Sequence, residues 1–185
     1  MGSVTLYRDG RPLLIDVGVE TYSKKTFSPQ RYEIWTMQSG WHNLPQFDPD
    51  GAKYDQQPGA AFAAADVTVT DALDGLAMDL APAYGAVPGL GRYRRSVHLT
   101  DAGLTLHDET DYPGTVALTL MSVEKPAVNG DTVAFGALAA AAVTGADKIV
   151  TEAVPITDPR LRQAWPDTLY RTRIYFTRQL SLVIQ

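Results

Sequence analysis

The chain of 185 residues contains no cysteine. Disulfide bonds and thiolate metal sites are therefore excluded. The absence does not determine the cellular compartment, because proteins of oxidising and of reducing compartments can both lack cysteine.

Long apolar runs are also missing. The richest stretch, residues 134–143, is short and rich in alanine, whereas a membrane-spanning helix needs about 18 apolar residues. No basic segment followed by an apolar core opens the chain, so the N-terminus does not resemble a signal peptide. The chain instead runs at once into VTLYRDGRPLLIDVG, a strand, turn and strand. Because a natural protein seldom begins inside a hairpin, we expect a C-terminal fragment of a longer protein, whose compartment stays open, with the periplasm or secretion as the options for the parent.

Positive charge is scarce. Lysine and arginine number 16 against 21 acidic residues, which gives a net charge of −5 and a pI near 5.1. Nucleic-acid binding requires a basic face, so a nucleic-acid partner is disfavoured. The arginines cluster only locally, within two strand-like segments, and we predict that their side chains lie on solvated strand faces. They are Arg92, Arg94 and Arg95, and then Arg171, Arg173 and Arg178.

Catalytic and nucleotide-binding signatures are absent as well. The sequence has no GxSxG, GxxxxGK[ST], GxGxxG or HExxH motif. Asp48, Asp50 and Asp55 form only a loose acidic group without the alternation of a calcium-binding loop, so a solvated loop is the better interpretation.

What the sequence does have is period-two alternation. Turn signals recur every eight to twelve residues, and almost no segment has helical spacing, which predicts an all-β fold, a large antiparallel sandwich or barrel, as one domain over residues 1–185. A helical turn is expected only at residues 157–165, with Asp158 as N-cap and Pro159 in the first position. The expected strands include residues 4–7, 13–15, 31–37, 65–70, 76–80, 93–99, 104–108, 116–122, 132–135, 139–143, 148–152, 169–177 and 180–184.

Asp16 and His42 are the two candidate metal ligands. Asp16 ends the apolar run PLLID, and a buried carboxylate must be paired, hydrogen-bonded or bound to a metal. The alternative is that Asp16 caps the turn that leads to Gly18. His42 could bind a divalent ion, or it could be a structural histidine hydrogen-bonded within its loop. His98 and Asp108 are more consistent with surface positions.

An aromatic group surrounds His42 along the sequence. Trp35, Trp41, Tyr22 and Tyr32 could form a platform for sugar rings, or they could be core residues. The strand pattern favours a core position for Trp35 and Tyr32. Trp41 lies beside a turn and is more consistent with exposure, so Trp41, Asn43 and Tyr22 are the candidate substrate-binding residues.

The order of these segments resembles the C-terminal domain of the heparinase II/III-like polysaccharide lyases. The resemblance covers essentially the whole chain and is most specific over residues 16–45, with DVG and RYEIWTMQSGWHNLP. GRYRRSVHL, LTLHDE and DPRLRQAWPDTLYRTRI also fit, from residues 91, 104 and 158 onward. Members of that family join an N-terminal α/α toroid to a large antiparallel β-sandwich and cleave acidic polysaccharides by β-elimination.

The resemblance implies a zinc site in the sandwich, with Asp16 and His42 as two ligands and a third ligand upstream of Gly2. It also implies that the main acid and base groups lie in the toroid. The isolated domain should then be inactive or nearly so, and its toroid-facing surface should carry an apolar patch that could drive self-association. Two other functions stay open: a free-standing carbohydrate-binding or structural module, and an interaction domain without a ligand.

Overall fold

The computed structural model describes residues 1–57, 67–69 and 74–185. It is built from β-strands and single-turn 3-10 helices, and every strand pairing is antiparallel. The strands are β1 (Leu6–Arg8), β2 (Arg11–Leu14), β3 (Pro45–Phe47), β4 (Val67–Val69), β5 (Gly75–Asp79), β6 (Tyr93–Thr100), β7 (Gly103–Thr110), β8 (Val116–Ser122), β9 (Pro126–Asn129), β10 (Thr132–Phe135), β11 (Ala139–Thr144), β12 (Lys148–Pro155), β13 (Thr168–Phe176) and β14 (Gln179–Ile184).

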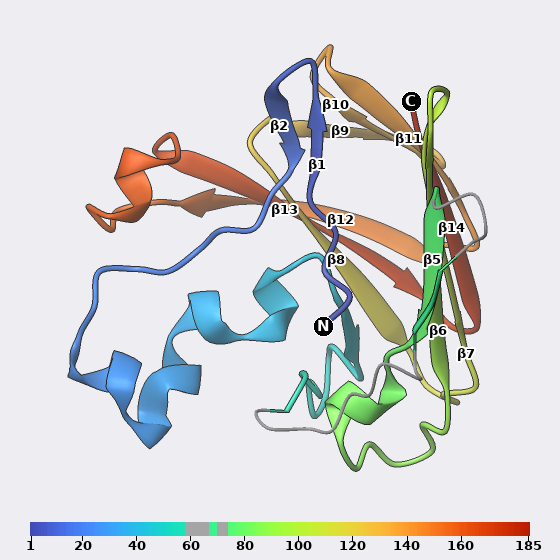
Figure 1. Ribbon diagram of the computed structural model, residues 1–185, viewed down its shortest axis with the longest axis horizontal. Helices are drawn as coiled ribbons and strands as arrows, with labels where there is room; N and C mark the ends of the chain where they lie inside the picture. Colours follow the sequence, from blue (N-terminus) through green and yellow to red (C-terminus); the bar gives the residue numbers. More distant parts are fainter. Residues whose placement is uncertain (58–66, 70–73) are drawn as a thin grey trace.

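Two sheets and a separate hairpin make up the fold. One sheet has eight strands in the order β4-β5-β6-β7-β14-β11-β10-β9, the other has four in the order β12-β13-β8-β3, and β1 pairs with β2. Figure 1 shows the larger sheet along one side of the molecule and over its top, with β12, β13 and β8 crossing the middle. This arrangement confirms the predicted all-β, sandwich-like fold.

The main core lies between these sheets. It combines Leu118 and Leu120 of β8 with Leu106 of β7 and Leu180 and Leu182 of β14, all almost fully buried. A smaller apolar cluster forms on the outer side of the four-stranded sheet, around Ile15, Val17, Met121, Val154, Ile156, Leu161 and Leu169. Apolar groups cover both faces of β8, and all seven of its residues are buried, including the polar Thr119 and Ser122.

The hairpin expected near the start of the chain is present, and the strands expected at 93–99 and 104–108 also pair as a hairpin. Asp9 and Gly10 join β1 to β2 with φ of 50° and 74°, the positive values that an Asp-Gly two-residue turn requires. Residues 100–103 join β6 to β7. The helical turn expected near Asp158 is present as the 3-10 turn η7 (Leu161–Gln163), but it begins two residues later than predicted, with Arg160 rather than Asp158 at the N-cap position. Asp158 Oδ1 accepts hydrogen bonds from the backbone N–H groups of Arg160 and Leu161, both at 3.0 Å.

The strand predicted at residues 31–37 is wrong. The segment forms successive 3-10 turns: η1 (Lys24–Phe27), η2 (Pro29–Glu33), η3 (Trp35–Met37) and η4 (Ser39–Trp41). Its aromatic composition favours a strand, but Ile34 and Trp35 are adjacent and so break period-two alternation. Ser28 and Pro29 instead start a turn, in which the Ser28 hydroxyl accepts a hydrogen bond from the Gln30 N–H at 3.1 Å.

Further differences concern segment limits. The short strands β3 and β9 were not predicted, and half of the strand predicted at 65–70 lies outside the described residues, with β4 as its described part. Another short 3-10 turn, η6 (Ala81–Tyr84), precedes the loop before β6. Within the described ranges, no helix is long and apolar enough to cross a membrane.

Arg95 and Asp108 contradict the surface positions predicted for them. Both side chains are completely buried, and they form an ion pair of 2.7 Å. On β6, Arg95 lies two residues from the buried Tyr93, so both side chains point to the inner face, and Arg95 is the direct cross-strand neighbour of Asp108. Sequence reasoning treated charge as a sign of exposure, although a charge with an opposite partner in register can be buried. Arg94 and His98 are exposed, as predicted.

Candidate functional site

Asp16 and His42 lie side by side although 26 residues separate them. His42 Nδ1 is 2.8 Å from Asp16 Oδ2. Asp16 follows β2 and projects outward between Ile15 and Val17, which are both buried in the outer apolar cluster. His42 ends η4. The predicted convergence of a carboxylate and an imidazole is therefore present.

Both partners make further hydrogen bonds within the chain. His42 Nε2 lies 3.1 Å from the carbonyl oxygen of Thr36. Asp16 Oδ1 accepts a hydrogen bond of 2.9 Å from the N–H of Gly18, whose φ is 83°. The turn-capping role considered for Asp16 is therefore realised together with the histidine contact.

These contacts shift the acid strength of Asp16. The hydrogen bond from His42 lowers the pKa of the Asp16 carboxyl below its ordinary value; partial burial opposes this shift, while the charge of His42 and the Gly18 N–H reinforce it. The carboxylate is thus stabilised in its charged form.

A pH dependence of stability follows from that direction. The pKa of Asp16 is lower in the folded state than in the unfolded state. The stabilisation of the fold by Asp16 is therefore complete above the unfolded-state pKa, and it is lost as the pH falls through the folded-state pKa. We expect Asp16→Asn to lower the unfolding free energy near neutral pH by no more than about 1 kcal/mol, since the side chain is 45% exposed. Urea unfolding between about pH 3 and pH 7 should show the wild type and variant converging in acid. The exposed Asp50→Asn is the control, and a difference that persists unchanged into acid would contradict this account.

A surface depression of about 330 Å³ contains the pair. Its wall includes Met1, Ser3, Asp16, Tyr32 and His42. Met1 and Ser3, at the start of the chain, thus lie at the same depression as the Asp16–His42 pair.

As a zinc site, the pair is incomplete. A carboxylate oxygen and an imidazole nitrogen are suitable donors, but a catalytic zinc ion needs three protein ligands. Across 1–57, 67–69 and 74–185, no group of three or more histidine, aspartate or glutamate side chains could hold a metal ion. In addition, each ring nitrogen of His42 already faces an oxygen. The described residues alone therefore do not fit a zinc ion.

Asn43 is a buried structural residue. Its side chain is engaged on both sides: Nδ2 donates to the carbonyls of Val4 (2.6 Å) and Ile15 (3.1 Å), and Oδ1 accepts from the N–H of Met121 (2.7 Å). Only 1% of the residue is exposed. Contact with a substrate would require these bonds to break, so its position beside His42 in the sequence does not translate into a position on the surface.

Trp41 and Tyr22 occupy different environments. Trp41 is partly buried, with its ring 4.9 Å from the ring of Trp35 and the Arg171 guanidinium 3.5 Å from its centroid. Tyr22 is 55% exposed, and Tyr32, expected in the core, is 43% exposed. Of the two tyrosines, only Tyr32 lines the Asp16–His42 depression, and the Arg31 guanidinium lies 5.5 Å from its ring centroid.

Sequence reasoning missed Arg95, the buried residue that anchors this site. Arg95 Nη1 donates to the carbonyl oxygens of Gly2 (2.8 Å) and Asn43 (3.0 Å), while its other nitrogens bind Asp108. One buried cation therefore ties the beginning of the chain and the His42 turn to β6 and β7. The alternation of Tyr93, Arg95 and Val97 on one strand was the available signal.

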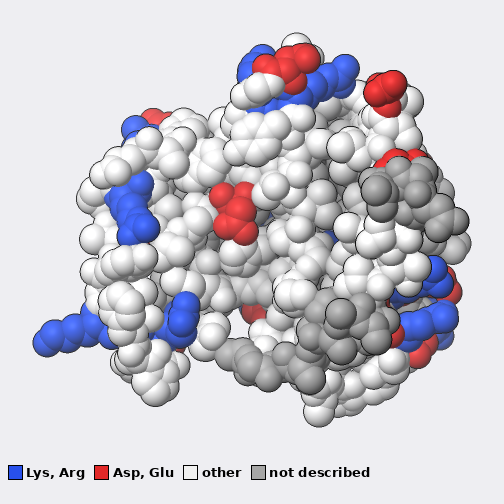
Figure 2. All heavy atoms as spheres, viewed as in Figure 1, with Lys and Arg blue, Asp and Glu red and all other residues white. Residues whose placement is uncertain are grey.

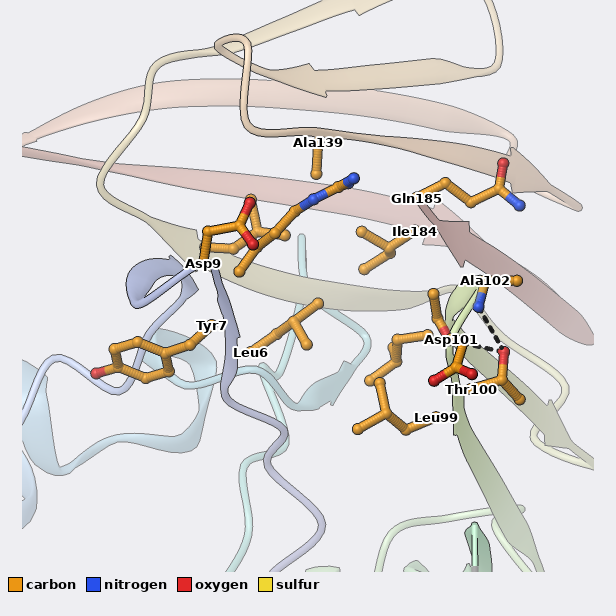
Figure 3. Close-up of a pocket in the computed structure, with 14 residues that line it drawn as sticks. Leu6, Tyr7, Asp9, Leu99, Thr100, Asp101, Ala102, Ala139, Ile184 and Gln185 are labelled. Atoms are coloured by element: carbon orange, nitrogen blue, oxygen red, sulfur yellow. Dashed lines mark hydrogen bonds between the residues drawn. The ribbon is translucent and has the colours of Figure 1, made fainter.

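A second depression of about 330 Å³ lies at the tip of the β1–β2 hairpin. Figure 3 shows Leu6, Leu99 and Ile184 along its apolar wall, with Asp9 and Asp101 at its rim. The polar side chains that line it, among them Arg8, Asp9, Asp101 and Gln185, are exposed, and it shares no residue with the Asp16–His42 depression.

Comparison with known proteins identifies the fold. No protein-family model matches the chain. No curated protein matches it either. Among solved structures, a heparinase III crystal structure matches 99% of the chain with 18% identity and a TM-score of 0.62. A mutant of the heparan sulfate lyase HepC from Pedobacter heparinus matches 99% with 14% identity and a TM-score of 0.61. The chain spans 29% and 30% of the length of those two proteins. The predicted resemblance in fold to heparinase-like lyases is thereby confirmed.

Proposed function

We propose that this chain, which has the fold of part of heparinase III, is the β-sandwich domain of a polysaccharide lyase that acts on acidic, uronate-containing polysaccharide. The observation that supports the proposal most directly is the contact between Asp16 and His42 in a depression that the chain's first residues also line. An N-terminal toroid domain would face this depression and complete the cleft.

The reaction of such a lyase is a β-elimination. A base removes the proton α to the uronate carboxyl, and the bond to the 4-linked oxygen breaks as an acid protonates the departing oxygen. This domain would provide one wall of the cleft, with His42 held in place by Asp16 and Thr36. The principal acid and base groups would come from the toroid, so the isolated chain would be inactive or nearly so.

Zinc is part of the proposal for the complete parent. Asp16 and His42 would provide two ligands, and the remaining ligand would come from the parent's preceding segment, next to Met1 and Ser3. Binding of zinc would replace the direct Asp16–His42 hydrogen bond. In this chain alone, zinc should bind weakly or not at all.

Replacement of His42 tests the proposal. In the complete parent, His42→Ala should lower the rate of unsaturated-product formation by about tenfold or more, the range seen when residues around a metal or catalytic group are removed. The rate is followed by ultraviolet absorbance on heparan sulfate and on other uronate polysaccharides. His98→Ala is the matched control, because His98 is exposed on β6 and does not line the depression.

Two results would count against this function. One is an unchanged rate in the His42→Ala parent, which would remove the histidine from the site. The other is substantial cleavage by the isolated chain, which would show that no toroid is needed. Zinc content, measured in the parent with and without His42, separates the metal proposal from the lyase proposal.

A free-standing carbohydrate-binding module is the second candidate function. Its support is the 55% exposure of Tyr22, although the Arg160 guanidinium lies 4.4 Å from that ring's centroid; Trp41 is partly buried, with Arg171 over its ring. Such a module would bind polysaccharide in a parent that cleaves none. Self-association of the isolated domain stays a prediction, which its sedimentation behaviour can test.

A further inference from the structure

Two aromatic side chains in contact are exposed on one side of the molecule. Phe27, at the end of η1, is 80% exposed, and Tyr22 is 55% exposed. Their ring centroids are 5.4 Å apart, in an edge-to-face arrangement. Large exposed rings that touch one another form an apolar surface, and such surfaces are commonly sites of interaction.

Cations accompany these rings. The Arg160 guanidinium lies 4.4 Å from the centroid of Tyr22, and Lys24 is exposed on the same turn as Phe27. Lys25 is paired with Glu33 at 2.6 Å. Across 1–57, 67–69 and 74–185, the ion pairs include neither Lys24 nor Arg160. Figure 2 shows several separate lysine and arginine side chains on the left of the molecule, and others at its top and on its right.

The surface is held together by a contact between distant segments. The Thr21 N–H lies 3.1 Å from both carboxylate oxygens of Asp158, which also caps the turn containing Arg160. The Trp165 indole N–H donates to the carbonyl of Val17 at 2.9 Å. The Asp158 carboxylate therefore accepts hydrogen bonds from backbone N–H groups. Through these bonds the fold holds Arg160 next to Tyr22.

We infer that Tyr22, Lys24, Phe27 and Arg160, the aromatic–basic surface, form a secondary binding site for an anionic polysaccharide. The two cations would pair with carboxylate or sulfate groups, and the Phe27 ring would stack against the apolar face of a sugar. The inference rests on the proposed function for its choice of ligand class. It goes beyond that function because none of the four residues lines the Asp16–His42 depression.

Charge and shape favour this ligand over two others. Nucleic-acid binding requires a broad basic face, whereas this surface contributes two cations, Lys24 and Arg160, in a chain of net charge −5. A membrane-surface site would usually present a long amphipathic helix, whereas η1 and η7 are turns of four and three residues. Two cations beside two exposed rings fit a thin polymer that carries both charge and apolar ring faces.

Binding of this chain to heparan sulfate oligosaccharides, measured by titration calorimetry, tests the inference. The double variant Phe27→Ala with Arg160→Gln should bind about tenfold more weakly, a change equal to about 1.4 kcal/mol. It should also show a weaker dependence on salt, because one cation is gone. Matched controls are the exposed Tyr7→Ala and Arg8→Gln on β1, which should bind like the wild type.

Four outcomes would overturn the inference. These outcomes are equal binding by the double variant, equal loss in the β1 controls, equal binding of neutral dextran, and a preference for anionic lipid vesicles over heparan sulfate. His42→Ala should leave this binding unchanged while it lowers the parent's cleavage. A parent that cleaves no polysaccharide would therefore refute the proposed function. Equal binding of heparan sulfate by the wild type and the double variant would refute the secondary site.

Discussion

Asp108→Ala is expected to destabilise the protein by about 3–5 kcal/mol, because it leaves the guanidinium of Arg95 buried without its counter-ion. Asp108 accepts hydrogen bonds from Arg95 Nε (2.8 Å), Arg95 Nη2 (2.7 Å) and the Tyr93 hydroxyl (2.6 Å). The arginine and the aspartate are both 0% exposed, so water cannot replace the lost partner. Burial, together with the adjacent Asp108 charge, raises the pKa of Tyr93, so the tyrosine stays a neutral donor.

The measurement is urea unfolding of the wild type and variants. Arg94→Ala, one residue away but exposed, should change stability by no more than about 0.5 kcal/mol. The double variant Arg95→Met with Asp108→Leu should recover part of the loss, since an apolar pair can replace a buried ion pair. Recovery should be incomplete, because the carbonyls of Gly2 and Asn43 lose their donor. A loss below about 1 kcal/mol in Asp108→Ala would show that the buried charge finds another partner.

Asn43→Ala is the second substitution with a large expected effect. It removes the acceptor for the Met121 N–H and the donor for the carbonyl of Ile15, which are buried, and the donor for the partly buried carbonyl of Val4. Each buried polar group left without a partner costs about 1–3 kcal/mol. We therefore expect a loss of about 2–4 kcal/mol in thermal or urea unfolding.

Asn43→Asp separates shape from hydrogen bonding. The side chain keeps its size, but a carboxylate oxygen would face two carbonyl oxygens, so this variant should be at least as unstable as Asn43→Ala. Asn129→Ala on the exposed end of β9 is the control and should be close to neutral. A wild-type stability in Asn43→Asp would mean that these hydrogen bonds contribute little.

Both substitutions bear on the candidate site as well as on stability. Arg95 binds the carbonyl of Asn43, and Asn43 binds the carbonyl of Ile15. Ile15 and Asn43 are the chain neighbours of Asp16 and His42, respectively. The network therefore sets the separation of the two functional side chains. Loss of the hydrogen bonds of Arg95 or of Asn43 should therefore also weaken the pH dependence of folding stability that is attributed to Asp16.

Local patterns in the sequence were sufficient for most of the fold. Asp-Gly between two apolar runs predicts the β1–β2 hairpin, and alternation at residues 93–99 and 104–108 predicts β6 and β7. These signals work because a strand's period of two and a turn's positive φ are properties of neighbouring residues. Asp16 and His42 were also identified from the sequence, where the resemblance to lyases singled out DVG and HN.

Tertiary structure alone decided the rest. Arg95 and Asp108 are buried because register places opposite charges together, which neither strand reveals by itself. Residues 31–37 form 3-10 turns rather than a strand, although their composition suits a strand. Whether Trp41 was exposed depended on Arg171, 130 residues later along the chain, which covers its ring. Local sequence therefore determined where strands and turns form, whereas the burial of each charge and ring depended on partners that only the folded chain brings within contact.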